Sequence, residues 1–378
     1  MTDKRNTPMR GLESVVAADT MLTYVDGQNG KLYHRGYDMD TLAGHICYEE
    51  IVYLLWFGKL PNKSELEHFR SELVAEMRIP MQVVEILKLA PPNANPMVVL
   101  RTAVSSMGMF DPDGGKNNEA ANLRKAKRLV AQVATVVAFY YRILQKKPII
   151  SADAKMGFAE NFLYIFTGKQ PTKLEKKVFD TTLVLHADHG LAASTFAARA
   201  TVSTLAGMHS SIAAALASLK GPLHGGANTR VMEMLEDIGK PSNVKSYIEG
   251  MLSDKKRIMG FGHRVYKTED PRSHHLRKYA EKLSKNEANK KLFEISHHIE
   301  KIVVEKKGIN PNVDFYSATV QRALGIPKEF YTCIFASARV AGWAAHVMEQ
   351  FRDNRLIRPT SNYIGGFDQK FVTIDKRD

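Results

Sequence analysis

Apolar residues recur at intervals of three and four positions along most of the 378 residues of this chain. That interval places side chains on one face of an α-helix, because the helix turns once every ~3.6 residues. In segment 201–219, this face consists of Leu205, Met208, Ile212, Leu216 and Leu219. The Lys220-Gly221-Pro222 sequence that follows is typical of a helix end. The same pattern predicts helices over 48–57, 63–77, 119–145, 174–185, 227–238, 273–304, 315–324 and 331–352.

Strand patterns are few. Residues 24–27 and 31–34 flank a Gly/Asn turn and predict one N-terminal β-hairpin, and residues 370–374 predict another short strand near the C-terminus. The fold class that follows is all-α, with a small N-terminal β-hairpin. Because a chain of this length exceeds what one hydrophobic core usually fills, we expect two domains.

The composition is that of an ordinary globular protein, with 44% hydrophobic and 25% charged residues. A net charge of +13 raises nucleic acid as a partner. The charged residues are dispersed rather than gathered into a run, so most of the excess positive charge fits a solvated basic surface. Binding of an anionic small molecule would account for part of that excess. Cys47 and Cys333 lie in apolar helical patterns, so we expect two buried thiols and no disulfide. No segment has the apolar length of a membrane span, and we expect a cytoplasmic protein.

Known cofactor fingerprints do not fit the glycine-containing segments. The segment GPLHGG (221–226) lacks the Lys-Ser/Thr of a phosphate-binding loop, and GFGHRV (260–265) follows no strand of a βαβ unit. His186 and His189 are three residues apart and would share one helix face, as a metal-binding pair does. No HExxH frame or nearby cysteine accompanies them, so hydrogen bonding is the favoured role for both.

Three polar residues lie in loops or at helix ends, where a side chain is accessible yet held in place. His224 precedes the helix expected at 227–238, where backbone N–H groups favour a neutral imidazole. His263 lies beside glycines that allow a ligand to approach the backbone. Asp314 begins the helix expected at 315–324. Taken alone, each also fits a structural role: a hydrogen-bonded loop histidine for the first two, an N-cap for Asp314.

Three arginines complete a candidate anion site. Arg272 follows a rigid Asp-Pro turn, Arg339 lies off the apolar stripe of the helix expected at 331–352, and Arg358 precedes a proline beyond that helix. Guanidinium groups suit carboxylates because they donate two parallel hydrogen bonds. A solvated surface arginine is the alternative for each of them.

Together these residues resemble the citrate synthase family over almost the whole chain. The segments that carry the resemblance are YVDGQNGKLYHRGY (24–37), GKLP (58–61), LHADHGLAAST (185–195), LKGPLHGGAN (219–228), MGFGHRVYKTEDPR (259–272), NPNVDFYSA (310–318), ARVAGWAAHVMEQ (338–350) and RLIRPTSNYIG (355–365). Their order and spacing are those of the family. The resemblance implies a two-domain helical fold, in which residues 1–219 and 322–378 form a large domain. Residues 220–321 would form a small domain that closes over the substrates and excludes water.

The resemblance implies an acyltransferase of the tricarboxylic acid cycle that condenses acetyl-CoA with oxaloacetate to give citrate and CoA. The methyl group of a thioester is a weak acid, so the reaction needs a base and a group that stabilises the carbonyl oxygen. By resemblance, Asp314 is the base and His224 hydrogen-bonds the thioester oxygen. His263 would polarise or protonate the ketone of oxaloacetate. The resulting citryl thioester is then hydrolysed.

The resemblance also supplies substrate-binding residues. Those expected to bind oxaloacetate are His189, Arg272, Arg339 and Arg358. Arg358 would reach the active site of the other subunit, which makes a homodimer obligatory for activity. Those expected to bind CoA are Lys256, Arg257, Ile258, Met259, Gly260 and Lys267. No metal, redox cofactor, nucleic acid or membrane is implied.

One departure and three alternatives accompany this interpretation. Gly190 stands where many relatives carry a glutamate, so a carboxylate that would orient the substrate loop is lacking. A 2-methylcitrate synthase would use propionyl-CoA with the same residues, and one methyl group is worth only about 1–3 kcal/mol of discrimination. A basic helical nucleic-acid-binding protein would account for the charge but not for the ordered histidines and Asp314. ATP-dependent citrate cleavage would require a phosphate-binding loop, which the sequence lacks.

Overall fold

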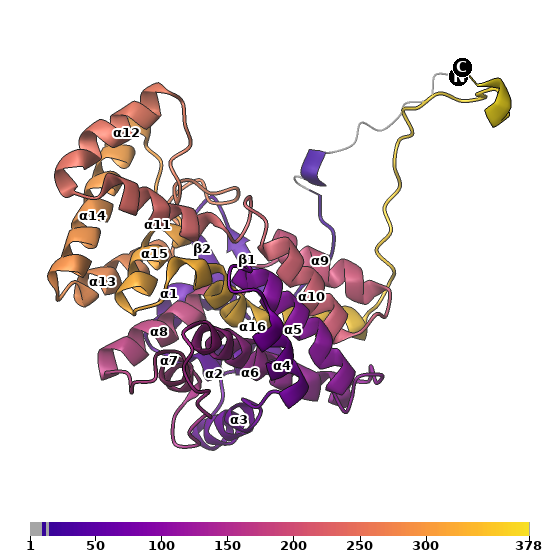
Figure 1. Ribbon diagram of the computed structural model, residues 1–378, viewed down its shortest axis with the longest axis horizontal. Coiled ribbons are helices and arrows are strands. Elements are labelled where there is room, and N and C mark those ends of the chain that lie inside the picture. Colours follow the sequence, from indigo (N-terminus) through magenta and orange to yellow (C-terminus); the bar gives the residue numbers. More distant parts are fainter. Residues whose placement is uncertain (1–9, 13–14, 378) are drawn as a thin grey trace.

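The computed structural model describes residues 10–12 and 15–377, and most of this part is helical (Figure 1). The helices are α1 (Met39–Leu42), α2 (Tyr48–Phe57), α3 (Lys63–Ala75), α4 (Met81–Leu89), α5 (Pro96–Phe110), α6 (Glu119–Leu144), α7 (Phe158–Thr167), α8 (Lys173–His186), α9 (Ala193–Ser203), α10 (Met208–Leu219), α11 (Ala227–Ile238), α12 (Val244–Ser253), α13 (Ser273–Leu283), α14 (Glu287–Lys307), α15 (Val313–Ala323) and α16 (Tyr331–Arg352). Short 3₁₀-helices cover Arg10–Leu12, Pro241–Asn243, Lys328–Phe330 and Ile374–Lys376. The predicted all-α class is confirmed.

The predicted N-terminal hairpin is also confirmed, and a third strand extends it. Strands β1 (Thr23–Asp26), β2 (Lys31–His34) and β3 (Tyr37–Asp38) form one antiparallel sheet in the order β1-β2-β3. The register pairs Thr23 with His34. The side chains of these two residues are hydrogen-bonded on the buried face of the sheet.

Three secondary-structure predictions are wrong. The helix expected at 201–219 begins only at Met208, because Leu205 and Gly207 adopt φ angles of +65° and +87° that interrupt it. The helix expected at 273–304 is two helices, α13 and α14, and the side chain of Asn286 caps the second. The strand expected at 370–374 is not formed; this stretch is irregular and leads into a 3₁₀-helix.

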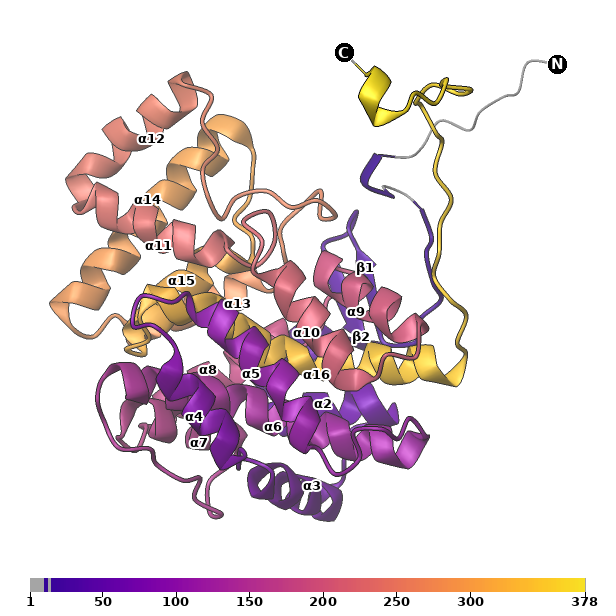
Figure 2. The same ribbon diagram turned by 45° about the vertical axis from the view of Figure 1, so that its right-hand side comes forward.

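Helix α16 forms the centre of the molecule and packs against α2, α5, α6, α8, α9, α10 and α11 (Figures 1 and 2). Its side chains are buried on every face, as expected for a helix that is apolar all round. One close approach brings Gly342 of α16 against the loop after α8, where its N–H donates to the carbonyl oxygen of Ala187 at 3.1 Å. A Cβ atom at Gly342 would lie only 2.4 Å from Oδ1 of Asp188.

Helices α11 to α15 pack against one another and lie together at one end of the molecule (Figure 1). They fall within the range 220–321 that was expected to form a small domain, apart from the last residues of α15. The boundaries of the two domains stay a prediction.

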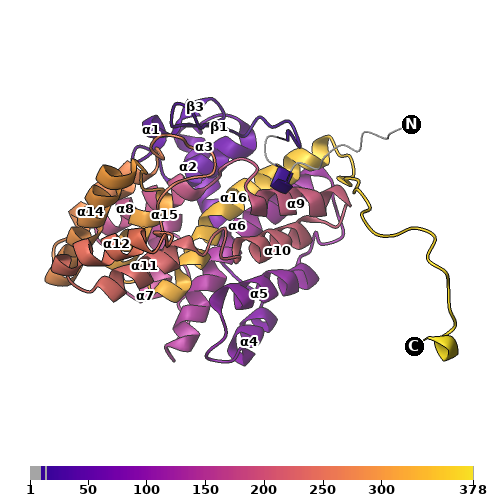
Figure 3. The same ribbon diagram turned by 90° about the horizontal axis from the view of Figure 1, so that it is seen from above.

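The C-terminal segment leaves the helical body after α16 (Figures 1 to 3). In 353–377 every residue except Ile357 is exposed, including several large apolar side chains: Leu356, Tyr363, Ile364, Phe367 and Phe371. Within the described part of the chain, no helix combines the length and apolarity needed to span a membrane.

Candidate active site

Two loops pair with each other in front of α15 and hold His263 beside that helix. The N–H of Gly262 donates to the carbonyl oxygen of Asn310 at 3.0 Å, and the N–H of Asn312 donates to that of Gly260 at 2.8 Å. The side-chain amide of Asn312 donates to the Gly262 carbonyl oxygen at 2.8 Å. Gly260 has a φ of +80°, and a Cβ atom there would lie 2.9 Å from the side chain of Phe315. The glycine is therefore required for the loop to approach α15.

Asp314 is the second residue of α15, and its carboxyl group does not cap the helix. The N-cap is Asn312, whose side chain accepts a hydrogen bond from the Asp314 N–H at 3.1 Å, so an N-cap role for Asp314 is wrong. Oδ1 of Asp314 is buried and has no hydrogen-bond partner among the described residues. Burial raises the pKa of Asp314 to about 7, against the lowering effect of Arg272. Such a carboxyl group can exchange a proton near neutral pH.

His263 is held by the backbone that follows it. Its Nδ1 accepts hydrogen bonds from the N–H groups of Val265 at 3.0 Å and Tyr266 at 3.2 Å. This assigns the proton of the neutral imidazole to Nε2, which can donate to a ligand. Burial lowers the pKa of His263 to about 4, and Arg272 lowers it further, so the ring is neutral at pH 7.

His189 lies next to His263, with ring centroids 5.3 Å apart. Its Nε2 is 3.1 Å from the hydroxyl group of Tyr266. Burial, together with Arg272, lowers the pKa of His189 well below its ordinary value. His186 is hydrogen-bonded to the carbonyl oxygen of Thr182 at 2.7 Å. The expected hydrogen bonding of both histidines is confirmed, but a shared helix face is wrong because α8 ends at His186.

His224 lies in the turn between α10 and α11. Its Nε2 is 2.8 Å from the hydroxyl oxygen of Ser194 and accepts from the Ser194 N–H at 3.3 Å, which leaves the ring proton on Nδ1. Trp343 donates its indole N–H to the same hydroxyl oxygen at 3.2 Å. Burial lowers the pKa of His224 to about 4, with a further contribution from Arg339. A neutral imidazole can donate one hydrogen bond without releasing a proton.

Two of the three arginines are buried, so the interpretation of them as surface residues is wrong. Arg272 makes two parallel hydrogen bonds with Asp270, at 2.9 and 2.8 Å. Burial alone would lower the pKa of Arg272, but the neighbouring Asp270 raises this pKa above its ordinary value. Arg339 donates to the carbonyl oxygen of His186 at 2.7 Å and lies over the ring of Phe335. Burial lowers its pKa to about 10, so it stays charged at pH 7.

Sequence reasoning missed the acids that hold this cluster. Asp270 pairs with Arg272 and also accepts from the N–H of Val313, which ties the loop to α15. Asp188 precedes His189, is fully buried, and accepts from the hydroxyl group of Thr23 at 2.5 Å and the N–H of Gly190 at 3.1 Å. The position of Asp270, two residues before Arg272, could have indicated an ion pair between them. No sequence signal pointed to Asp188, because its side-chain partners Thr23 and His346 come from distant elements.

The backbone conformation at position 190 explains why a glycine stands there. Its φ is +58°, a conformation that L side chains rarely adopt, and its N–H binds Asp188. A glutamate at this position would be strained in this backbone conformation. Gly190 therefore forms a tight turn that Asp188 holds.

The candidate CoA-binding residues follow α12 and lead into the Gly260 turn. Lys256 and Arg257 are exposed, while Ile258 is buried and Met259 packs against the core. Lys267 is exposed, and its N–H donates to the carbonyl oxygen of Gly27 in the N-terminal hairpin at 2.8 Å.

Among the residues expected to bind oxaloacetate, Arg358 is the one that the chain does not bring to this cluster. It lies exposed on the extended C-terminal segment, which leaves the body at the end of α16. The other three residues expected to bind oxaloacetate are His189, Arg272 and Arg339, and they lie in this cluster.

The helical fold brings together three neutral histidines, a carboxyl group with a pKa near 7 and two buried arginines. Such a site is typical of an enzyme that performs acid–base chemistry on an anionic substrate. Comparisons with known proteins agree. The profile of the family described as "Citrate synthase, C-terminal domain" matches residues 11–360. "Citrate synthase 2" of Bacillus subtilis is 46% identical over 372 residues, 98% of this chain and 100% of that protein. The chain therefore belongs to the citrate synthase family.

Two further relatives bear on substrates. The "Citrate/2-methylcitrate synthase" of Bacillus subtilis is 39% identical over 356 residues, 94% of this chain and 96% of that protein. A solved ternary complex of carboxymethyl coenzyme A and oxaloacetate with citrate synthase from the archaeon Thermoplasma acidophilum has a TM-score of 0.92 at 36% identity. The similarity covers 97% of this chain and 99% of that one. The nucleic-acid-binding alternative is disfavoured by this family membership.

Proposed function

We propose that this chain is a citrate synthase that condenses acetyl-CoA, oxaloacetate and water to citrate and CoA. The observation that carries the proposal is the carboxyl group of Asp314. Its Oδ1 has no partner among the described residues, and its pKa of about 7 lies near neutral pH. A carboxylate with a raised pKa is a stronger base than an ordinary one, as removal of a proton from a thioester methyl group requires.

In the first step, Asp314 takes a proton from the methyl group of acetyl-CoA, and the electron pair moves onto the thioester oxygen. Nδ1–H of His224 donates a hydrogen bond to that oxygen, because its Nε2 is engaged with Ser194. With a pKa of about 4, His224 donates without giving up its proton. An enol or enolate is stabilised in this way.

In the second step, the enol carbon attacks the ketone carbon of oxaloacetate. Nε2–H of His263 polarises or protonates the ketone oxygen, since Nδ1 is held by backbone N–H groups. Arg272, Arg339 and His189 bind the carboxylates of oxaloacetate. Water then cleaves the citryl thioester, which releases citrate and the thiol of CoA. These proton transfers need no metal or redox cofactor, because groups of the chain perform them.

For the second substrate, we propose that the backbone of 256–260 binds the adenine of CoA. Gly260 allows the backbone to turn there. Lys256, Arg257 and Lys267 are exposed cations suited to the phosphates of CoA. The reaction places the enzyme in the tricarboxylic acid cycle. Both cysteines are free, which fits the reducing cytoplasm.

Release of the CoA thiol tests the proposal directly. Purified protein is mixed with oxaloacetate and either acetyl-CoA or propionyl-CoA, and the thiol is followed with a chromogenic disulfide. We expect acetyl-CoA to give the higher kcat/KM. Absence of thiol release with both substrates, by folded protein, would refute the function.

A 2-methylcitrate synthase activity is the second candidate, because one relative carries both activities in its name. The two acyl groups differ by one methyl group, so a single side chain beside the thioester can decide between them. A kcat/KM for propionyl-CoA equal to or above that for acetyl-CoA would favour this candidate.

We further propose a homodimer in which Arg358 completes the site of the partner subunit. Support comes from its position: the C-terminal segment that carries Arg358 extends away from the cluster of its own chain (Figure 3). Two-fold symmetry would place one copy in each site.

Subunit exchange tests the shared site. Arg358→Ala and Asp314→Asn chains are each expected to be nearly inactive, whereas their heterodimers regain activity, because one of the two sites then has both residues intact. Arg355→Ala, exposed on the same segment, is the matched control and should stay active. Verified heterodimers without recovered activity would place Arg358 in its own subunit's site or outside it.

A further inference from the structure

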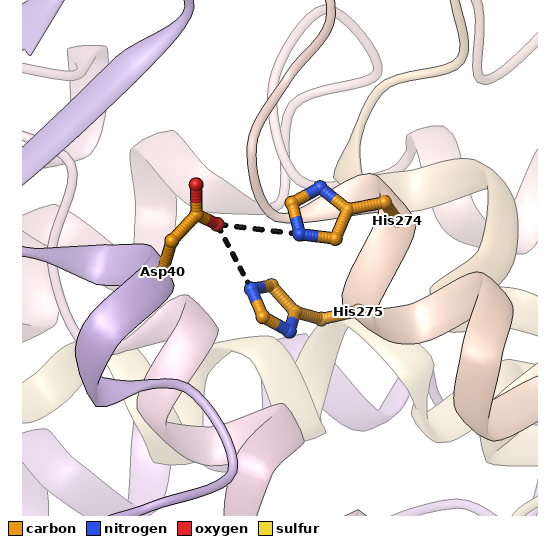
Figure 4. Close-up of side chains that lie close together, drawn as sticks. All are labelled: Asp40, His274 and His275. Carbon is orange, nitrogen blue, oxygen red and sulfur yellow. Dashed lines mark hydrogen bonds and ion pairs between the residues drawn. The ribbon is translucent and has the colours of Figure 1, made fainter.

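Three side chains outside the catalytic cluster converge on one point (Figure 4). Oδ1 of Asp40, from α1, lies 2.9 Å from Nε2 of His275 and 3.3 Å from Nε2 of His274, both in the first turn of α13. One ligand atom from each residue lies within 4.8 Å of the others. No other group of three histidine, cysteine or acidic side chains meets this condition among the residues that the structure describes.

From this geometry we propose that Asp40, His274 and His275 form a binding site for a divalent transition-metal ion of the zinc class. Two imidazole nitrogens and one carboxylate oxygen, with water in the fourth position, are a common ligand set for zinc. Ligand atoms around a tetrahedral zinc ion, ~2.0–2.1 Å from the metal, lie about 3.4 Å apart. The observed 3.3 Å separation fits, and the 2.9 Å one would widen by a few tenths of an ångström.

The surroundings leave the three ligand atoms available. Asp40 uses its other oxygen, Oδ2, toward Lys31 at 3.6 Å, and Lys31 is already bound to Asp38 at 2.9 Å. The carboxylate can therefore bind an ion through Oδ1 without losing its lysine neighbour. Nε2 of His274 and Nε2 of His275 both face Oδ1 of Asp40, so each imidazole presents a ring nitrogen to the same point. The side chains are partly exposed, which gives an ion access from solvent.

A bound ion would join two segments that lie far apart in the sequence. Asp40 belongs to the short helix that packs on the N-terminal sheet, whereas His274 and His275 open α13, 235 positions later in the case of His275. An ion that binds only the folded arrangement stabilises the folded protein by mass action. The site does not contribute a group to the proposed reaction, so it is independent of the proposed function.

Metal binding by untagged, metal-free protein of full length tests the proposal. Zinc chloride is titrated calorimetrically, and cobalt chloride is titrated while the visible absorption of tetrahedral Co²⁺ is followed. We expect one zinc ion per chain, a tetrahedral cobalt spectrum and a rise in Tm of roughly 3 °C at saturating zinc. His274→Gln/His275→Gln should weaken binding at least ~10-fold and abolish the Tm rise.

His297→Gln/His298→Gln is the matched control, because it removes another adjacent histidine pair, on α14, and should leave binding unchanged. Asp40→Asn provides a second ligand variant if the double histidine variant fails to fold. Lack of saturable zinc binding by the parent protein would overturn the proposal. Equal binding by the parent and the ligand variants would also overturn it, as would binding that depends on His263 instead.

Discussion

Replacement of Asp314 by asparagine should lower activity and raise stability at the same time. Burial raises the pKa of this carboxyl group from 3.8 to about 7. Between these pH values the folded chain keeps the proton that the unfolded chain has released. The free energy of unfolding therefore falls as pH rises through this window, and the penalty is complete above about pH 7. Below about pH 4 the group contributes nothing, because it is protonated in both states.

The size of the penalty follows from the width of that window. Each pH unit contributes ~1.4 kcal/mol, so about three units give an upper bound of roughly 4 kcal/mol. Solvent screens a side chain that is only partly covered, and we expect about half of this bound. Asp314→Asn should then be about 2 kcal/mol more stable than the parent at pH 8. The corresponding rise in Tm is roughly 2–5 °C.

Activity should change in the opposite direction. An amide has nearly the same shape as the carboxylate but cannot act as a base, and loss of a base lowers turnover by roughly 10²–10⁴-fold. In the parent, kcat/KM should rise with pH, with a midpoint near pH 7 that reports ionisation of Asp314. The assays are thiol release across pH and thermal unfolding at about pH 4.5 and 8.

Asp237→Asn, an exposed acid of α11, is the control and should alter neither quantity. Two results would refute the reasoning. A variant whose turnover stays within a few-fold of the parent would remove Asp314 from the base role. A stability difference that is equal at both pH values would show that the carboxyl group is not held with a raised pKa.

Three further substitutions test the packing around the site. Asp270→Asn should lower the free energy of unfolding by about 3–5 kcal/mol in urea titrations, because it leaves Arg272 buried without its partner; a loss below about 1 kcal/mol would contradict this. Gly260→Ala should destabilise the protein by about 1–3 kcal/mol, because φ is +80° and the new Cβ would meet Val231. It should also raise KM for acetyl-CoA. An unchanged KM would argue against this turn as a CoA contact. Gly342→Ala should lower the free energy of unfolding by about 1–3 kcal/mol, because the new Cβ would overpack the contact with Asp188. Gly250→Ala is the control and should not destabilise α12, because no atom lies within 4 Å of its new Cβ. Equal effects of the two substitutions would refute the close approach at Gly342.

Sequence periodicity predicted the long helices well and their interruptions poorly. The helix at 331–352 was predicted with the bounds that the structure shows, because apolar spacing that continues over so many turns is typical of a long buried helix. The helix expected at 201–219 failed because Leu205 continues the apolar spacing, yet it is 58% exposed and its backbone has left the helix. Periodicity records which side chains are apolar, not the backbone angles between them. Helices α1, α4, α5, α7 and α12 were not predicted, and of α9 only its last residues lay in a segment predicted as helical.

The candidate residues were predicted more fully than their environments. Resemblance located His224, His263 and Asp314 along the chain, but composition could not tell that Arg339 is buried. Arg339 is buried and donates to the carbonyl oxygen of His186 at the end of α8, a helix that packs against α16. The environment of a charged group is a tertiary property, and a single sequence carries little information about it.

In each catalytic candidate, some polar atoms hold the residue in place and another is left for the substrate that we propose. His263 is held through Nδ1, and the proposed contact with the ketone would use Nε2. His224 is held through Nε2, and the proposed contact with the thioester would use Nδ1. Asp314 is held through its backbone by Asn312, and Oδ1 remains without a partner among the described residues. An unpaired buried polar atom destabilises a folded protein, and a substrate that binds it removes that penalty. Oδ1 of Asp314 is therefore a buried atom that the fold leaves unsatisfied and that the proposed reaction would use.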